Sequence, residues 1–104
     1  MACSVRWAAD DWGSGFTANV GVTNLGAARS SWTATFTFPG DQRVTGGWNA
    51  TVSQSGATVT ARNVSWNGGL AAGATVTFGL QATYSGTNAH PTDFRLDGTA
   101  CSIG

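Results

Sequence analysis

The residues best suited to bind another molecule are three tryptophans that stand in glycine-containing segments. They occur as Trp12-Gly13, as Gly47-Trp48 and as Trp66-Asn67-Gly68. An indole is a flat apolar plate with a polar N–H edge. Such a plate can stack on a β-linked glucose unit, whose faces carry C–H groups while its hydroxyls point sideways. The pattern alone leaves surface display and partial burial of these rings equally open.

The alternation of apolar and polar residues argues for burial of two of these rings. Trp48 has the same parity as Val44, and Trp66 has the same parity as Val64. Side chains of equal parity point to the same face of a strand. Only an irregularity at Gly46-Gly47, such as a β-bulge, would turn Trp48 outward.

Groups that could perform catalysis are sparse. Glycoside hydrolysis usually needs two carboxylates that face each other across a cleft. The carboxylates here are five aspartates, all expected in turns or at strand ends, where Asp commonly serves the turn itself: Asp10, Asp11, Asp41, Asp93 and Asp97. His90 is the only histidine and has no second His or Cys to share a metal. We therefore expect no catalytic site, no metal and no cofactor.

Composition narrows the class of protein and of partner. Only 10% of the 104 residues are charged, with neither Lys nor Glu, and the formal net charge is zero. The overall field therefore attracts neither nucleic acid nor an anionic membrane. Five Trp, five Phe and 15 Gly fit short strands joined by tight turns. No apolar run is long enough to span a bilayer.

Strict alternation predicts the elements that must position these residues. The clearest strands are expected at 16–24, 31–38 and 74–84, and weaker ones at 4–8, 43–52, 57–62 and 93–96. The 43–52 segment is interrupted at Gly46-Gly47. We predict an all-β, antiparallel β-sandwich of jelly-roll or immunoglobulin-like type with about 7–9 strands. Its core should hold the even-numbered residues of the long strands, together with Trp7 and Tyr84.

The two cysteines, Cys3 and Cys101, lie at opposite ends of the chain. A metal or redox pair would be closely spaced and accompanied by further ligands. A disulfide that ties the terminal strands together is the preferred interpretation, and it implies a secreted, extracellular protein. Two unpaired buried thiols are the alternative. We expect residues 1–104 to contain one module. Met1 and Ala2 are expected to be start residues that precede the module proper.

In their order along the chain, these motifs resemble those of the family 2 carbohydrate-binding modules, which are attached to secreted bacterial polysaccharide-degrading enzymes. The likeness extends from Cys3 to Cys101. The matching residues are Cys3, Trp12-x-x-Gly15-Phe16, Val20-Gly21-Val22-Thr23-Asn24, Trp32-Thr33, Phe36-Thr37-Phe38-Pro39, Trp48-Asn49, Val52-Ser53-Gln54-Ser55-Gly56, Trp66-Asn67-Gly68, Phe78-Gly79, Asn88-Ala89-x-Pro91-Thr92 and Gly98-Thr99-x-Cys101.

The resemblance implies a β-sandwich with joined terminal strands and a carbohydrate-binding face formed by Trp12, Trp48 and Trp66. The subgroup that keeps all three tryptophans binds crystalline cellulose and often chitin. The xylan-binding subgroup lacks the middle tryptophan and carries Arg three residues after the first one. Here Trp48 is present and Gly15 occupies that position, which favours cellulose.

The resemblance also implies polar contacts around the tryptophans. Asn19 and Gln81 match polar binding positions of the family and lie on the polar face of their strands. Gly46 and Thr77 stand where the family often has amides, so the polar contacts differ while the stacking platform is kept. Two glycosylation sequons lie beside the binding tryptophans: Asn49-Ala50-Thr51 and Asn63-Val64-Ser65.

The resemblance thus implies a non-catalytic, monomeric module that attaches a covalently linked catalytic domain to insoluble polysaccharide. Within the same family, a preference for xylan or chitin is the alternative. A small hydrolase of the same polysaccharides and an adhesive sandwich without a sugar ligand are alternatives of other classes. Release of reducing sugar would indicate the first of these, and failure to bind cellulose, chitin and xylan alike would indicate the second.

Overall fold

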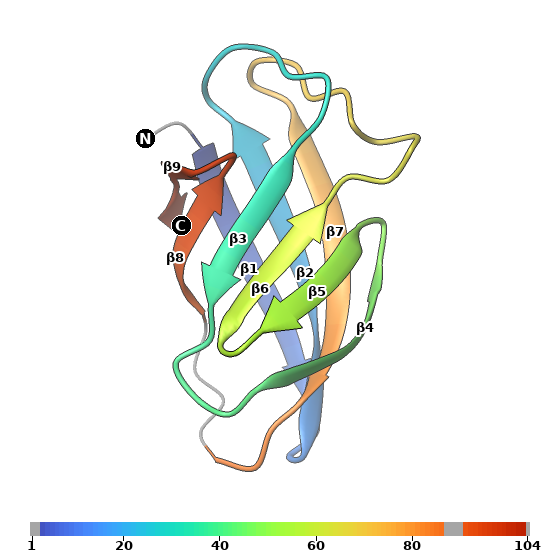
Figure 1. Cartoon of the computed structure of the whole chain (residues 1–104), viewed down its shortest axis with the longest axis vertical. Coiled ribbons are helices and arrows are strands. Elements are labelled where there is room, and N and C mark those ends of the chain that lie inside the picture. The colour runs from blue at the N-terminus through green and yellow to red at the C-terminus, as the bar shows by residue number, and fades with distance from the viewer. Residues whose placement is uncertain (1–2, 87–90, 104) are drawn as a thin grey trace.

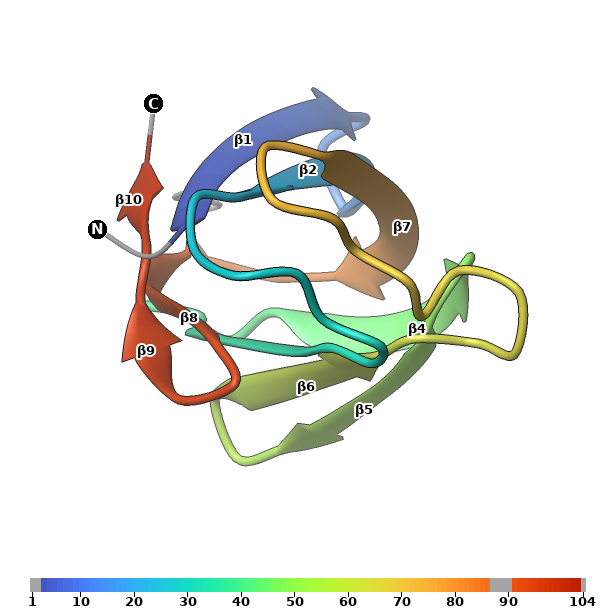
Figure 2. The same ribbon diagram turned by 90° about the horizontal axis from the view of Figure 1, so that it is seen from above.

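Two five-stranded sheets packed face to face form the protein (Figures 1 and 2). The computed structural model describes residues 3–86 and 91–103, and the regular secondary structure in these ranges consists of strands alone. The first sheet has the order β10-β1-β2-β7-β4 and the second the order β5-β6-β3-β8-β9. The strands are β1 (Cys3–Asp11), β2 (Gly15–Asn24), β3 (Thr33–Thr37), β4 (Arg43–Trp48), β5 (Thr51–Ser55), β6 (Thr58–Arg62), β7 (Thr75–Thr83), β8 (Thr92–Leu96), β9 (Thr99–Ala100) and β10 (Ser102–Ile103).

This architecture confirms the predicted all-β sandwich. The named strands pair in antiparallel fashion, except that β10 runs parallel to β1. The two-residue strands β9 and β10 are too short to show alternation, and they bring the number of strands to ten. Strand β1 continues to Asp11, beyond the expected 4–8, because it remains paired with β2 as far as Phe16.

The even-numbered residues of β2, β3 and β7, which correspond to the three clearest predicted strands, fill the space between the sheets, as predicted. Strands β2 and β7 supply the largest share of this core, and their own odd-numbered residues face outward. Trp7 and Tyr84 are only partly buried, although both rings pack against the core. The fully buried large side chains include Phe16, Val20, Trp32, Phe36, Phe38, Phe78, Leu80 and Leu96.

The segment 43–52 differs from the expectation of one interrupted strand. Strand β4 belongs to the first sheet and β5 to the second, so the chain passes from one sheet to the other at Asn49-Ala50. Asn49 adopts φ 62°, a left-handed conformation that Asn tolerates better than most residues. Apolar alternation cannot reveal this crossover, since both strands keep one face toward the same core.

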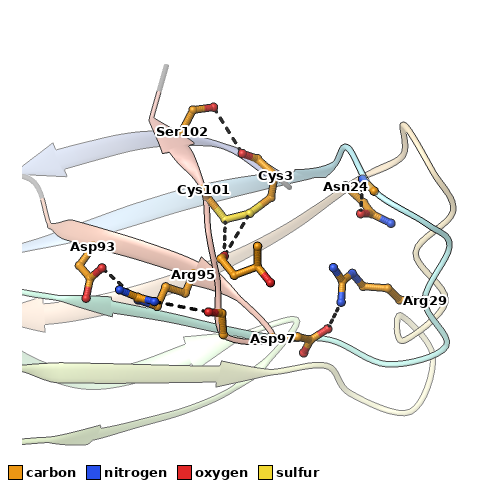
Figure 3. The surroundings of a disulfide bond; sticks show 11 residues. Cys3, Asn24, Arg29, Asp93, Arg95, Asp97, Cys101 and Ser102 are labelled. Atoms are coloured by element: carbon orange, nitrogen blue, oxygen red, sulfur yellow. Dashed lines mark hydrogen bonds and ion pairs between the residues drawn. A yellow bond between two sulfur atoms is a disulfide. The ribbon is translucent and has the colours of Figure 1, made fainter. Parts of the chain in front are cut away.

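A disulfide between Cys3 and Cys101 joins the first and last parts of the described chain, as predicted (Figure 3). The two Cα atoms lie 4.6 Å apart. Backbone bonds support the closure, because the Cys101 N–H donates to the Phe94 carbonyl at 2.8 Å. The Ser102 hydroxyl donates to the Cys3 carbonyl at 3.3 Å. The two ends of the described chain are thus held together by the disulfide, by the Ser102–Cys3 hydrogen bond and by the parallel pairing of β10 with β1.

Several expectations concern residues outside the described ranges. They are the start residues Met1 and Ala2, His90, and the Asn88-Ala89 part of one family motif. In residues 3–86 and 91–103, no helix is long and apolar enough to cross a membrane. In the same ranges, no three His, Cys, Asp or Glu side chains come together in a group that could hold a metal ion.

Candidate functional site

Three large indoles lie on the surface of the sandwich. The exposed fraction is 54% for Trp12, 40% for Trp48 and 70% for Trp66, against 1% for the core residue Trp32. We refer to Trp12, Trp48 and Trp66 as the exposed tryptophans. Among the described residues, none of the three stacks on another aromatic ring of the chain. A large part of each indole is therefore accessible to a ligand.

Trp12 lies over the start of β2. A Cβ atom placed on Gly15 would come within 2.9 Å of Trp12 Cζ2, so the indole covers the bare Cα of this glycine. Gly15 is on the outward-facing side of its strand, as are Thr17 and Asn19. Gly15 is also the position at which the xylan-binding subgroup carries Arg.

Hydrogen bonds hold the turn that carries Trp12. The Trp12 N–H donates to the Gly15 carbonyl at 3.0 Å, and the Gly13 N–H donates to Asp11 Oδ1 at 2.7 Å. The Asp11 carboxylate also accepts from the Tyr84 hydroxyl at 2.6 Å and 2.8 Å. The hydrogen bond to the Asp11 carboxylate raises the pKa of Tyr84, because it stabilises the protonated phenol. The turn is therefore tied to the end of β7.

Trp48 faces outward because of a β-bulge in β4. The pairing of β4 with β7 shifts register between Val44 and Gly46, which leaves Thr45 as the extra residue. Its hydroxyl donates to the Gln81 carbonyl at 3.2 Å. The bulge reverses the parity of the residues that follow, so Val44 packs on the core while Trp48 is exposed. This is the irregularity that the glycine pair suggested.

Trp66 projects from the loop between β6 and β7, so strand parity does not apply to it. Asn67 fixes this loop through hydrogen bonds of its main chain and its side chain, including one from its own N–H to the Val64 carbonyl at 3.3 Å. The Trp32 Nε1–H donates to the Asn67 carbonyl at 2.8 Å, and the Val64 N–H donates to Asn67 Oδ1 at 2.8 Å. Asn67 Nδ2 donates to the Asn49 carbonyl at 2.6 Å. Asn67 therefore connects the loop of Trp66 with the turn after Trp48.

Polar side chains flank Trp48 on the same outer face. Trp48 pairs with Gly79 of β7, and Gly79 pairs on its other side with Asn19 of β2. Gln81 and Thr77 lie two residues to either side of Gly79 along β7, and both are exposed. The predicted amides Asn19 and Gln81 are thus next to the platform of Trp48. Asn19 and Thr77 also border a groove of about 510 Å³ across β1, β2 and β7.

The two glycosylation sequons differ in structure. The side chain of Asn63 is engaged in the fold, since its Oδ1 accepts from the Trp32 N–H at 2.9 Å and its Nδ2 donates to the Val64 carbonyl at 3.1 Å. Asn49 is exposed in the turn after Trp48. Of the two side chains, that of Asn49 is the more accessible to a modifying enzyme in the folded protein.

Four of the five aspartates that could have been catalytic serve the structure instead, and Asp10 lies exposed in β1. Asp11 holds Tyr84, Asp41 holds the backbone and hydroxyl of Ser85, and Asp97 forms an ion pair with Arg29 at 2.6 Å. Asp93 pairs with Arg95 at 3.1 Å, as Figure 3 also shows. Each of these contacts orders a turn or a strand end. The arrangement offers stacking surfaces rather than a pair of reactive carboxylates.

Comparison with known proteins identifies the family. The sequence profile of the family described as "Cellulose binding domain" matches residues 3–101. The chain belongs to this family. Cellulose-binding domains of this kind are non-catalytic carbohydrate-binding modules.

Individual relatives extend this finding. The chain is 50% identical over 103 residues to Exoglucanase A of Cellulomonas fimi, covering 98% of this chain but only 12% of that enzyme. A chitin-binding domain from Streptomyces coelicolor has a TM-score of 0.76 and 41% identity, covering 96% of this chain and 94% of that one. An internal xylan-binding domain of Cellulomonas fimi xylanase D has a TM-score of 0.67 and 26% identity, covering 92% and 97%.

Sequence reasoning missed two residues of this site. Gly79 lies under Trp48, and its position in the middle of a strand was the available signal, because interior glycines often mark a close approach. Asn67 connects the segments of Trp48 and Trp66. Nothing in the local sequence indicates that bond, since its acceptor belongs to a different turn.

Proposed function

We propose that this cellulose-binding domain attaches a secreted polysaccharide-degrading enzyme to crystalline cellulose by stacking Trp12, Trp48 and Trp66 on sugar rings. The observation that supports this most directly is the exposure of all three indoles, which are 40–70% accessible. Two of them lie over strand glycines on the outer face of one sheet. That arrangement suits a flat polymer surface better than a small molecule, which would need an enclosed pocket.

Stacking supplies the affinity in this proposal. Covering about 100 Å² of one indole face at about 25 cal/mol per Å² contributes roughly 2.5 kcal/mol per ring, before ordering costs. Those costs are reduced because the Trp12 turn and the Trp66 loop are already fixed by hydrogen bonds. The amides of Asn19 and Gln81 can donate to the sideways-pointing hydroxyls of the sugar, which would set the position of the chain on the platform.

The biological role follows from attachment. A module held on the polymer raises the effective concentration of a linked catalytic domain at an insoluble substrate. We infer that the module is monomeric and extracellular and carries such a domain in the intact protein, with no role for nucleic acid or membrane. The 12% coverage of Exoglucanase A supports the linked domain, and the Cys3–Cys101 disulfide supports an oxidising location.

Chitin is the second candidate ligand, because the chitin-binding domain from Streptomyces coelicolor is 41% identical to this chain. Xylan is less favoured. The xylan-binding neighbour is only 26% identical, and this chain keeps Trp48 and the bare Gly15 that the resemblance associates with cellulose.

Binding isotherms on crystalline cellulose, chitin and insoluble xylan test the proposal. Trp12→Ala, Trp48→Ala and Trp66→Ala should each weaken cellulose binding about tenfold or more. Leu25→Ala is the matched control, since Leu25 is 55% exposed but lies in another loop, and it should bind like the wild type. Wild-type cellulose binding in all three tryptophan variants would refute the proposal.

The hydrolase alternative is tested separately. The chain should release no reducing sugar from soluble or insoluble glucans. Turnover that disappears in Asp10→Ala or Asp11→Ala would show that the module is an enzyme.

A further inference from the structure

Gly79 is buried, yet its missing side chain would point to the outer face of the sheet. Its partner on β2 is the exposed Asn19, and the flanking outward positions Thr77 and Gln81 are exposed as well. The atoms that cover Gly79 are those of the Trp48 indole. A Cβ atom placed on Gly79 would lie 1.9 Å from Trp48 Cε2, 2.2 Å from Cζ2 and 2.2 Å from Nε1. The ring therefore rests on the bare Cα.

No other glycine on the outer face of the first sheet is covered so tightly. A Cβ on Gly15 would meet the Trp12 ring at 2.9 Å, and a Cβ on Gly21 would meet Thr75 Cγ2 at 3.7 Å and Arg6 Cβ at 3.9 Å, which are ordinary contacts. A separation of 1.9 Å is far inside the contact distance of two carbon atoms, so even a methyl group and the present ring position exclude each other. The position of the indole depends on the absence of one side chain.

From this geometry we infer that Gly79 is a positioning residue for carbohydrate binding: its bare Cα is the floor on which Trp48 lies flat. The bulge at Thr45 turns Trp48 outward, and Gly79 then lets the ring lie along the sheet instead of standing away from it. Any side chain at position 79 displaces the Trp48 indole from its place on the sheet. This inference rests on the proposed function only in its effect on binding, because the ring position can be measured without a ligand.

The direct measurement is the NMR chemical shift of the Gly79 Hα proton that takes the place of a Cβ atom and so points to the Trp48 ring. Protons that face an aromatic ring are shifted upfield by its ring current. This Gly79 Hα signal should be shifted upfield in the wild type and should return to an ordinary glycine value in Trp48→Ala. An ordinary value of this signal in the wild type, or an upfield value that persists in Trp48→Ala, would overturn the inference whatever the protein binds.

The binding measurement uses Gly79→Ala, with Gly21→Ala as its matched control. Both glycines face outward on adjacent strands of the first sheet, but only the Cβ at position 79 meets an indole. Gly79→Ala should weaken binding to crystalline cellulose about tenfold or more, as displacement of an aromatic anchor does. Gly21→Ala should bind like the wild type. Equal binding by the wild type and a folded Gly79→Ala variant, where Trp48→Ala does lose binding, would overturn the inference.

A double-mutant cycle covers the case in which Gly79→Ala folds poorly. If the indole is the obstacle, Gly79→Ala should lower Tm in the wild-type background but not in the Trp48→Ala background. Without the ring, alanine should be tolerated at least as well as glycine in a strand interior. An equal loss of Tm in both backgrounds would show that the strand itself excludes a side chain and would overturn the inference. If the Hα shifts and the cycle behave as expected while Trp48→Ala still binds cellulose, the proposed function fails and the positioning of the ring stands.

Discussion

At the scale of a single residue, we propose that Gly15 determines how Trp12 lies on the sheet. A side chain there would start 2.9 Å from Trp12 Cζ2 and 2.9 Å from the Ala82 carbonyl oxygen. We expect Gly15→Arg to prop up the indole, to weaken binding to crystalline cellulose, and to strengthen binding to soluble xylan slightly, because a tilted ring suits a twisted chain. The gain for xylan should be small, since Trp48 remains in the way. Depletion assays on cellulose and affinity electrophoresis in xylan measure both effects.

The control for that substitution is the combination with Trp12→Ala. Once the ring is gone, Gly15→Arg should reduce cellulose binding no further. If Gly15→Arg is folded and binds cellulose like the wild type, Trp12 is not held by this contact.

Trp32 and Trp48 show that residues of one type can have opposite roles. Trp32 is 1% exposed, stacks on Phe78 at 5.6 Å between ring centroids and donates its Nε1–H to Asn67. Trp32→Ala should therefore cost about 3–5 kcal/mol of unfolding free energy, as other core truncations of large rings do. Trp48→Ala should change that free energy little, because the ring lies on the outer face of the sheet and not in the core. Urea denaturation of the two variants gives the comparison, and equal destabilisation would contradict it.

At the scale of the elements, the positions of the strands could be predicted from the sequence better than the bulge in β4 and the passage of the chain between the two sheets. The alternation in 16–24 and 74–84 is regular because each strand has one face on the core and one in water. The bulge at Thr45 and the change of sheet at Asn49 depend on how β4 meets β7, which periodicity within one segment does not encode. The role of Gly79 beneath the Trp48 ring could not be predicted for the same reason, since it depends on the pairing of Gly79 with Trp48.

Asn67 offers a test of the connection between two elements. Its Nδ2 donates to the Asn49 carbonyl, while its Oδ1 accepts from the Val64 N–H. Asn67→Asp keeps the acceptor and replaces the donor by a carboxylate oxygen that repels the carbonyl. At pH 7 this variant should bind cellulose more weakly, because the segments of Trp48 and Trp66 are no longer connected.

Acid provides the control for that prediction. Protonation of the new carboxyl below an ordinary Asp pKa of about 3.9 restores a donor, so binding should partly recover near pH 3. When the cellulose binding of Asn67→Ala is divided by that of the wild type at the same pH, this ratio should not rise between pH 7 and pH 3. If Asn67→Asp binds like the wild type at pH 7, the bond to Asn49 does not position the exposed tryptophans.

At the scale of the whole molecule, the balance of charge predicts how binding responds to salt. The formal net charge is zero, and the exposed tryptophans offer apolar faces rather than charges. Electrostatic attraction is screened by salt, whereas stacking is not. The affinity for cellulose should therefore change less than about twofold between roughly 0.05 and 0.5 M NaCl. A steep loss of binding with added salt would show that ion pairs, not indole faces, hold the polymer.

Removal of the disulfide tests whether the stability of the whole sandwich and the binding of cellulose are independent of each other. Cys3 and Cys101 are 98 residues apart in sequence, so their bond closes a loop of nearly the entire chain. In the chain-entropy model, the double variant Cys3→Ser with Cys101→Ser should lose about 4 kcal/mol of unfolding free energy. Cys3 and Asp11 are the two ends of β1, so the disulfide lies roughly 30 Å along the strand from the turn of Trp12.

Cellulose binding by the folded fraction of that variant should accordingly stay at the wild-type level, while its urea midpoint falls. Thiol titration of the oxidised wild type in denaturant should detect no free thiol, because the described cysteines are paired. Two titratable thiols would contradict the pairing itself. Loss of binding in a variant shown to be folded would mean that closure of the termini also shapes the outer face of the first sheet, through the β10–β1–β2 pairing that connects the disulfide to Gly15.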